Sequence, residues 1–159
     1  MPIKRSIALQ PLSRQHHNGL LFCLLLGKGV KRQASLIDMQ LFIRKFKAQD
    51  LNTHFATEEE LLLPLGTQYN ELQPLLDQMK SEHLQLAEVI DDIEHLPAYE
   101  SILKLSKLLE KHIRFEEQIL FIEIEKVISA SLLQEIQTVL HHDEHKTNCM
   151  NYPVKFWEG

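Results

Sequence analysis

Two stretches of the chain carry a histidine followed four residues later by a glutamate inside an otherwise apolar run. They read HFATEEELLL from residue 54 and HIRFEEQILF from residue 112. Residues four apart lie one turn apart on the same face of a helix, so His54 and Glu58 point the same way, as do His112 and Glu116. Imidazole nitrogens and carboxylate oxygens are ligands for transition metals. We therefore predict that both pairs turn toward the core as metal ligands.

The predicted burial of the two acids favours a metal over a purely polar core. An ionised carboxylate that is buried without a partner costs several kcal/mol, so a positive charge should lie beside it. His16 and His83, one from each of two further helices, would complete a set of four imidazoles and two carboxylates at one level of a bundle. A ligand set of this size and type holds two transition-metal ions, with the carboxylates free to bridge them.

Several nearby residues have more than one interpretation. His17 is the alternative to His16 as the ligand from its helix, and the helical period of the neighbouring apolar residues favours His16. Glu59 and Glu117 lie one place off the ligand face, so we expect them to be solvated or to contact ligands from outside. Glu82 could orient a ligand, although we expect a surface role.

A second group of candidate ligands lies near the C-terminus, where we expect an exposed polar tail rather than a metal site. Its members are His141, His142, Asp143 and His145. Phe156 and Trp157 follow them and could dock a partner protein, although burial against a helix is the expected role.

Helices must position these residues, and the composition favours them. Only five glycines and six prolines interrupt long stretches rich in Leu, Ile, Glu, Lys and Gln. Apolar periodicity and candidate caps at Ser13 and Ser35 predict helices at about 13–29, 35–66, 71–96 and 98–128, with a short one at about 131–140. Four long helices with short loops predict an all-α fold, an antiparallel up-down four-helix bundle with a short C-terminal helix and tail.

The chain length and an internal repeat predict how this bundle is organised. With 159 residues and 44% hydrophobic content, we expect a single domain, with its core in 11–128 and the short helix and tail in 129–159. The two histidine and glutamate stretches resemble each other, and RQHHNGL near residue 16 weakly echoes SEHLQLA near residue 83. The bundle therefore looks like a doubled helical hairpin.

Charge and hydropathy exclude some partners. The formal net charge is −5 and the basic residues are dispersed, so we expect no nucleic-acid partner. The apolar run LLFCLLLG is too short to cross a bilayer, so we expect no membrane partner. The two cysteines indicate no disulfide scaffold, and we expect a cytoplasmic protein.

From about Pro11 to Ile128 the chain resembles a hemerythrin-like, or HHE cation-binding, domain. The stretches that carry the resemblance are SRQHH, HFATEEELLLPL, SEHLQ and HIRFEEQILF. Members of this family are four-helix bundles that hold an oxo- or hydroxo-bridged pair of non-haem iron ions. The resemblance implies terminal ligands and bridging carboxylates in this chain, which would be His16, His54, His83 and His112 with Glu58 and Glu116.

Departures from the oxygen-carrying hemerythrins shape the expected function. Those proteins have a fifth histidine four places after the third-helix ligand, where this chain has Ala87. The chain therefore resembles the four-histidine branch, which includes proteins implicated in iron-sulfur cluster repair and nitric oxide responses. The resemblance implies a di-iron protein that binds, senses or reduces dioxygen, peroxide or nitric oxide. The alternative is an iron-sulfur cluster repair or iron delivery protein, and zinc or manganese also suits the ligand set.

Overall fold

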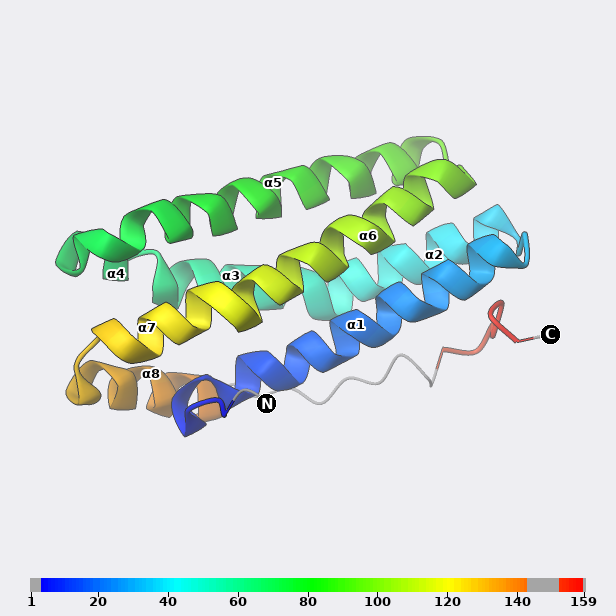
Figure 1. The fold of residues 1–159 in the computed structure, drawn as a ribbon. Helices are drawn as coiled ribbons and strands as arrows, with labels where there is room; N and C mark the ends of the chain where they lie inside the picture. The colour runs from blue at the N-terminus through cyan, green and yellow to red at the C-terminus, as the bar shows by residue number, and fades with distance from the viewer. Residues whose placement is uncertain (1–3, 143–151, 159) are drawn as a thin grey trace.

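The computed structural model describes residues 4–142 and 152–158, and within them the chain forms helices that pack side by side (Figure 1). The elements in chain order are η1 (Ile7–Leu9), α1 (Gln10–Lys31), α2 (Leu36–Phe46), η2 (Lys47–Leu51), α3 (Asn52–Leu62), α4 (Leu65–Gln68), η3 (Asn70–Leu72), α5 (Gln73–His95), α6 (Tyr99–Phe115), η4 (Glu116–Leu120), α7 (Phe121–Val127) and α8 (Ala130–His142).

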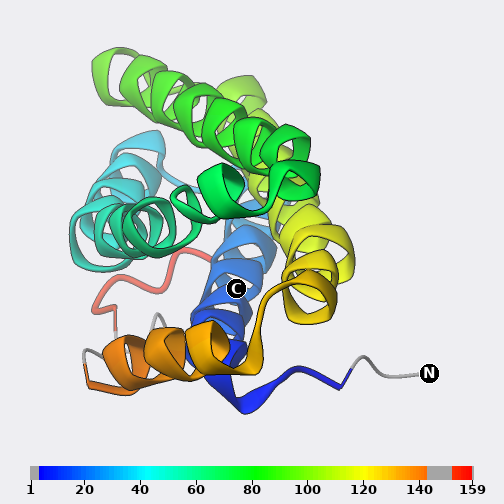
Figure 2. The ribbon, with the colours of Figure 1, turned by 90° about the vertical axis from the view of Figure 1, so that its left-hand side faces the viewer.

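Four long rods make up the bundle. The rods are α1, the run α2–η2–α3, α5, and the run α6–η4–α7, and each runs opposite to the rod before it (Figure 1). The end-on view shows these rods around a common centre, with α8 crossing beside the start of α1 (Figure 2). The predicted all-α, antiparallel up-down bundle with a short C-terminal helix is therefore confirmed.

The helix ends agree with the sequence in some places and differ in others. Ser35 caps α2 as expected, because its hydroxyl oxygen accepts a hydrogen bond from the backbone N–H of Asp38 at 3.3 Å. The expected cap at Ser13 is wrong, since α1 begins earlier, at Gln10. The same helix continues past Gly27 and Gly29 instead of ending there.

The core consists of two apolar clusters with a polar layer between them. One cluster includes Phe22, Phe42 and Leu105, and the other includes Leu12 and Phe121. Along α1, the residues of one cluster precede His16 and those of the other follow it, so the histidine lies between them. The buried polar layer at this level is the candidate site.

The C-terminal segment of residues 152–158 packs back on the bundle. Rings of Tyr152, Phe156 and Trp157 lie 4.9, 5.1 and 5.6 Å from the ring of Phe42, measured between centroids. The expected burial of Phe156 and Trp157 is confirmed, since only 8% and 5% of these residues is exposed. A β-carbon on Gly29 would lie 2.8 Å from Phe156, so glycine in α1 makes room for this segment.

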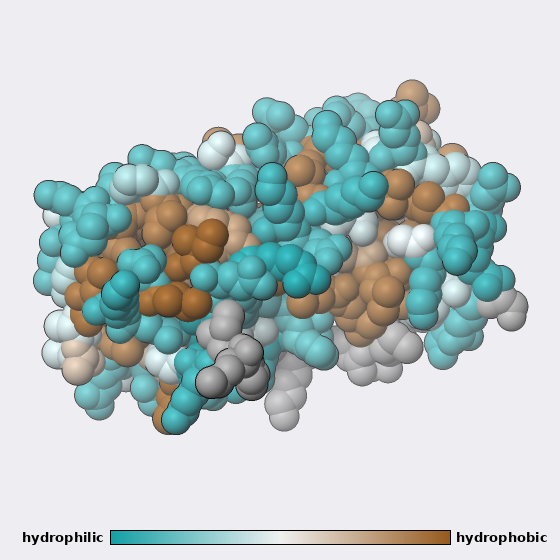
Figure 3. All heavy atoms as spheres, viewed as in Figure 1, coloured by the Kyte–Doolittle hydropathy of each residue, from teal (hydrophilic) through white to brown (hydrophobic). Residues whose placement is uncertain are grey.

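The outer surface carries mostly polar side chains. The face seen in Figure 3 is largely hydrophilic, with apolar patches between the charged groups. Among the described residues, no helix combines the length and apolar character needed to cross a membrane.

Candidate metal centre

All six predicted ligands lie together in the polar layer of the bundle. His16 comes from α1, His54 and Glu58 from α3, His83 from α5, His112 from α6, and Glu116 from the first position of η4. Each helix turns its apolar face inward, and these residues share that face, so the packing that buries the leucines also buries them. Both glutamates are fully buried, and none of the four histidines is more than 7% exposed.

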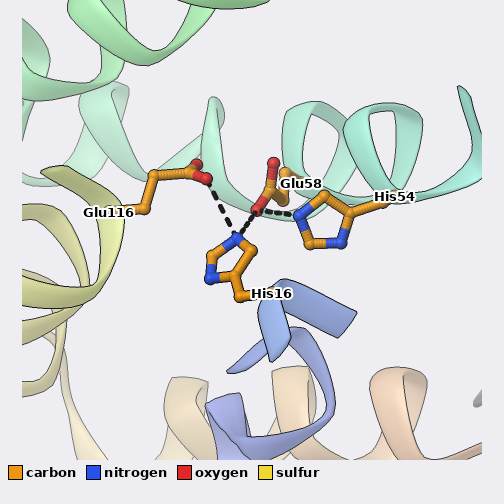
Figure 4. Close-up of side chains that lie close together, drawn as sticks. All are labelled: His16, His54, Glu58 and Glu116. Carbon is orange, nitrogen blue, oxygen red and sulfur yellow. Dashed lines mark hydrogen bonds and ion pairs between the residues drawn. The ribbon is translucent and has the colours of Figure 1, made fainter. Parts of the chain in front are cut away.

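Half of the layer is formed by His16, His54, Glu58 and Glu116, whose side chains point toward one another (Figure 4). The Nε2 atom of His54 lies 2.7 Å from Glu58 Oε1. The Nε2 atom of His16 lies 3.3 Å from Glu58 Oε1 and 3.1 Å from Glu116 Oε1. One ligand atom from each of the four residues lies within 4.8 Å of the others, a spacing that could hold a metal ion.

The other half uses the same two carboxylates with His83 and His112. The Nε2 atom of His83 lies 3.1 Å from Glu58 Oε2, and that of His112 lies 2.9 Å from Glu116 Oε1. This second group also has one ligand atom per residue within 4.8 Å. Glu58 and Glu116 therefore belong to two adjacent candidate positions.

The outward-facing nitrogen of each histidine ring has a partner of its own. The distances from Nδ1 to the side-chain oxygen are 3.0 Å for His16 and Glu117, 2.5 Å for His54 and Gln15, 2.9 Å for His83 and Glu59, and 2.8 Å for His112 and Glu82. An ionised carboxylate and the oxygen of a glutamine amide only accept hydrogen bonds, so Nδ1 of each ring carries the proton and donates the hydrogen bond. Each ring is thereby held with Nε2 toward the centre, as metal-ligating histidines are.

Sequence reasoning placed these outer partners only in part. The expected contacts of Glu59 and Glu117 with the predicted ligands are observed, at His83 and His16. The surface role expected for Glu82 is wrong, because its carboxylate holds His112 across the helix interface. Gln15 was missed. The internal repeat carried the signal, because Gln15 precedes His16 as Glu82 precedes His83.

The alternative ligands lie elsewhere. His17 is exposed on the surface of α1, while His16 is buried at the centre. His141 and His142 are exposed at the end of α8, and the Nε2 atom of His141 lies 3.1 Å from the backbone oxygen of Ile7. Asp143 and His145 lie outside the described residues.

The protonation equilibria of the cluster reflect its crowded charges. Burial alone would lower the pKa of His112, but the negative charge of the adjacent Glu116 carboxylate and the hydrogen bond to Glu82 raise it to about 10. The pKa of His16 is likewise raised, against burial, by the nearby carboxylates of Glu116, Glu117 and Glu58. Burial tends to raise the pKa of Glu58, yet neighbouring histidines hold it well below its usual range.

A further ion-pair network supports Glu117 from outside. Arg5 lies 2.8 Å from Glu117 Oε2 and 2.6 Å from Glu125 Oε1, and the hydroxyl of Ser13 donates to Glu117 Oε2 at 3.0 Å. Although burial raises the pKa of Glu117, hydrogen bonds from His16 and Ser13 and the charges of His16 and Arg5 lower it to about 2. Glu117 is therefore ionised at neutral pH and accepts a hydrogen bond from the Nδ1–H of His16.

The inward atoms of the cluster suit a cation. Among the described residues, the Nε2 atoms of His54, His83 and His112, Glu58 Oε2 and both carboxylate oxygens of Glu116 are buried without a properly oriented hydrogen bond. Buried polar atoms normally have such partners, and leaving them without one costs about 1–3 kcal/mol each. Metal coordination would satisfy these nitrogen and oxygen atoms together, so the residues fit a metal pair.

A small cavity reaches the cluster from the surface. Its volume is about 40 Å³, and His16, His54 and His112 line its inner end. Apolar walls come from Phe46, Leu51, Phe55, Leu109 and Ile113, and the polar residues along it are Gln15, Asn18, Gln49, Asp50 and Thr53. Gln49 and Thr53 are exposed, so the cavity connects the histidines with solvent.

Two π-helical turns lie in the rods that carry the paired histidine and glutamate. The turn η2 ends at Leu51, three residues before His54, and η4 begins at Glu116 itself. Turns of this kind often occur at functional sites. Here they lie beside the candidate ligand positions in both rods.

Comparison with known proteins gives one family match. Residues 9–124 match the family model described as the hemerythrin HHE cation binding domain, which covers every residue of the cluster. No curated protein matches the chain, and no solved structure does.

Proposed function

The chain belongs to the hemerythrin HHE cation-binding family, and from this premise we propose that it holds two iron ions in the bundle and binds a small ligand beside them. Family membership and the buried cluster of histidines and glutamates indicate metal binding. The proposed ligand is dioxygen, nitric oxide or a peroxide, which the protein binds, senses or reduces.

The convergence of four imidazole Nε2 atoms on two shared carboxylates is the observation that carries this proposal. In this assignment each ion would be held by its own pair of histidines, and the two ions would share both carboxylates. The pairs are His16 with His54 and His83 with His112, and the shared acids are Glu58 and Glu116. A carboxylate with its two oxygens near different histidines is suited to bridge two ions, and Glu58 has this arrangement.

The preference for iron comes from the family resemblance, because its members hold non-haem iron pairs. The nitrogen and oxygen donors themselves also suit zinc or manganese. When bound, an iron pair can offer an open coordination position to a small ligand and give or accept electrons. The protein supplies the rest, since the Nδ1 hydrogen bonds fix the rings and binding of a metal displaces the Nε2 protons.

The cavity supports the proposed size of the ligand. A water molecule needs roughly 10–15 Å³ of such volume, so a cavity of about 40 Å³ has room for a diatomic molecule or a peroxide. Its apolar walls, which include Phe55 and Ile113, limit water near the histidines.

The first test is the metal content of the aerobically purified, tag-free protein, measured per chain by mass spectrometry together with the visible spectrum before and after reduction. We expect two irons per chain and a charge-transfer band that disappears on reduction. A chain that binds no metal, even after anaerobic addition of ferrous iron, would contradict the proposal.

The ligand is tested separately on the iron-loaded, reduced protein. Dioxygen, hydrogen peroxide and nitric oxide are added singly, and the visible spectrum is compared with that of metal-free protein treated in the same way. We expect a spectral change with at least one of them. An unchanged spectrum with all three would contradict ligand binding and leave the metal assignment intact.

A further inference from the structure

The two metal positions differ in the residues that hold their histidines from outside. His83 and His112 each donate Nδ1–H to a carboxylate, Glu59 and Glu82. At the other position His16 donates to Glu117, but His54 donates to the neutral amide oxygen of Gln15. The pattern of contacts is the same at both positions, and Gln15 is the point at which its chemistry changes.

The charge of Glu117 is also offset, which enlarges the difference. Its Oε2 atom accepts from the Arg5 guanidinium at 2.8 Å and from the Ser13 hydroxyl at 3.0 Å, while Oε1 faces His16 at 3.0 Å. The ion pairs that Glu59 and Glu82 make within the described part of the chain are with their histidines.

The negative charge of Glu82 is offset less than that of Glu117, because its other neighbours are a neutral amide and a distant lysine. It accepts a hydrogen bond from the Gln78 amide at 2.8 Å, and the charge of Lys111 acts on it from further away than an ion pair. The outer partners therefore carry two largely uncompensated negative charges at His83 and His112. At His16 and His54 they carry one, which Glu117 and Glu125 share through Arg5, because Gln15 is neutral.

Outer carboxylates change how strongly a histidine binds metal. A carboxylate that accepts the Nδ1 proton raises the basicity of the ring, so Nε2 becomes a stronger donor, and loss of such a partner typically lowers metal affinity about 10–100-fold. An amide oxygen is a weaker acceptor and has no charge to stabilise the bound cation.

We propose that the two metal positions have unequal affinity, with the position at His83 and His112 filled first and the position at His16 and His54 holding the more exchangeable ion. The inference rests on the proposed function, because it requires both positions to bind metal. The cavity reaches both His16 and His54 but only His112 of the other pair, so the more weakly held ion is also the one that faces solvent.

The test uses zinc, which has no redox chemistry, titrated into the metal-free full-length protein in competition with a chromophoric chelator. We expect two binding steps whose affinities differ about tenfold or more. Gln15→Glu should tighten the weaker step about tenfold and leave the tighter one unchanged. Glu82→Gln should weaken the tighter step by about 10–100-fold.

Matched controls separate these effects from changes in overall charge. Gln118→Glu adds a carboxylate on the exposed surface of η4, and Glu88→Gln removes one from the exposed surface of α5. Both controls should leave the two steps unchanged. Circular dichroism of each variant reports whether the helices are retained, and Glu82→Asp should recover part of the affinity that Glu82→Gln loses.

The outcomes distinguish this inference from the proposed function. Two bound zinc ions of equal affinity, with Gln15→Glu and Glu82→Gln acting no differently from their controls, would overturn the inequality and keep the metal pair. An effect of Gln15→Glu on the tighter step would overturn the assignment of positions. Failure to bind any zinc or anaerobic ferrous iron would overturn the proposed function and the inference with it.

Discussion

The two helical hairpins of the bundle, α1 to α3 and α5 to α7, make the same contacts with the central cluster. In each hairpin the residue before the first histidine holds the second one, as Gln15 holds His54 and Glu82 holds His112. The acid after each buried glutamate reaches the first histidine of the other hairpin. The repeat therefore fixes where the histidine rings lie. A difference at one repeated position, Gln15 in place of an acid such as Glu82, changes the charge beside the ring.

Equivalence of the two buried acids is the first feature to test. Glu58→Ala and Glu116→Ala should each lower the metal content from two ions to less than one per chain, because each carboxylate belongs to both candidate positions. Metal per chain is measured after anaerobic loading with ferrous iron. Glu60→Ala, which removes an exposed acid from the same helix as Glu58, should leave it unchanged. Retention of both ions by either variant would contradict the shared role.

Aromatic support of the rings differs between the hairpins. Phe121 is fully buried and stacks on His16 at 5.4 Å, whereas Phe55 is half-buried, lines the cavity and stacks on His83 at 3.9 Å. We expect Phe121→Ala to lower the free energy of unfolding by about 3–5 kcal/mol, and Phe55→Ala by less, since its site can fill with water.

Urea unfolding of the metal-free variants measures both values. Leu96→Ala, at a residue that is 78% exposed, should change the free energy of unfolding by no more than about 0.5 kcal/mol. A larger loss from Phe55→Ala than from Phe121→Ala would reverse the comparison.

From the pKa values of the histidines we expect the stability of the metal-free and the metal-loaded protein to respond differently to pH. The pKa of His112 rises from 6.5 to about 10 in the folded chain, because the contributions of Glu116 and Glu82 exceed the effect of burial. A raised pKa stabilises the folded state fully below pH 6.5, and this stabilisation is lost as the pH rises to about 10. The pKa values of His16 and His83 are raised too, with the same sign.

Urea unfolding between pH 6 and pH 10 should therefore show the metal-free protein losing stability as the pH rises. Zinc-loaded protein should not lose it, because bound metal has already displaced the protons and binds more tightly as protons become scarce. Replacement of the exposed His17 by Gln should leave both profiles unchanged. A metal-free protein that gains stability over this range would contradict the protonation of the cluster.

The burial and clustering of the six central residues could be predicted from sequence because they follow from the geometry of one helix. A spacing of four residues places His54 and Glu58 on one face whatever the neighbouring helices do, and the apolar residues around them show that this face is buried. The same logic predicted the rods and their order. It also favoured His16 over His17, since only one of two adjacent residues can share the apolar face.

The outer contacts could be predicted only in part, because they depend on how one helix is rotated against another. The helical period of α5 places Glu82 beside the buried face of that helix. Its partner His112 belongs to α6, and no pattern within a single helix specifies that pairing. The glycine at position 29 also depends on neighbouring segments rather than on its own helix. Glycine costs about 1 kcal/mol inside a helix, but here it lies against Met39 and Phe156, where a side chain would not fit.

The smallest expected difference between the hairpins lies at the start of the rods that carry the paired ligands. Ser35 caps α2 through its hydroxyl, whereas the capping position before α6 is Ala98, which has the extended backbone of a capping residue and a methyl group that cannot accept a hydrogen bond. Ser35→Ala should therefore lower the free energy of unfolding by about 1 kcal/mol, and Ala98→Ser should raise it by roughly 0.5–1 kcal/mol. Midpoints of urea unfolding resolve changes of this size when the variants and the parent protein have the same dependence of the unfolding free energy on urea concentration. If Ala98→Ser destabilises the protein, the first turn of α6 is already satisfied by other groups, and the two hairpins are more alike at their ends than at their centre.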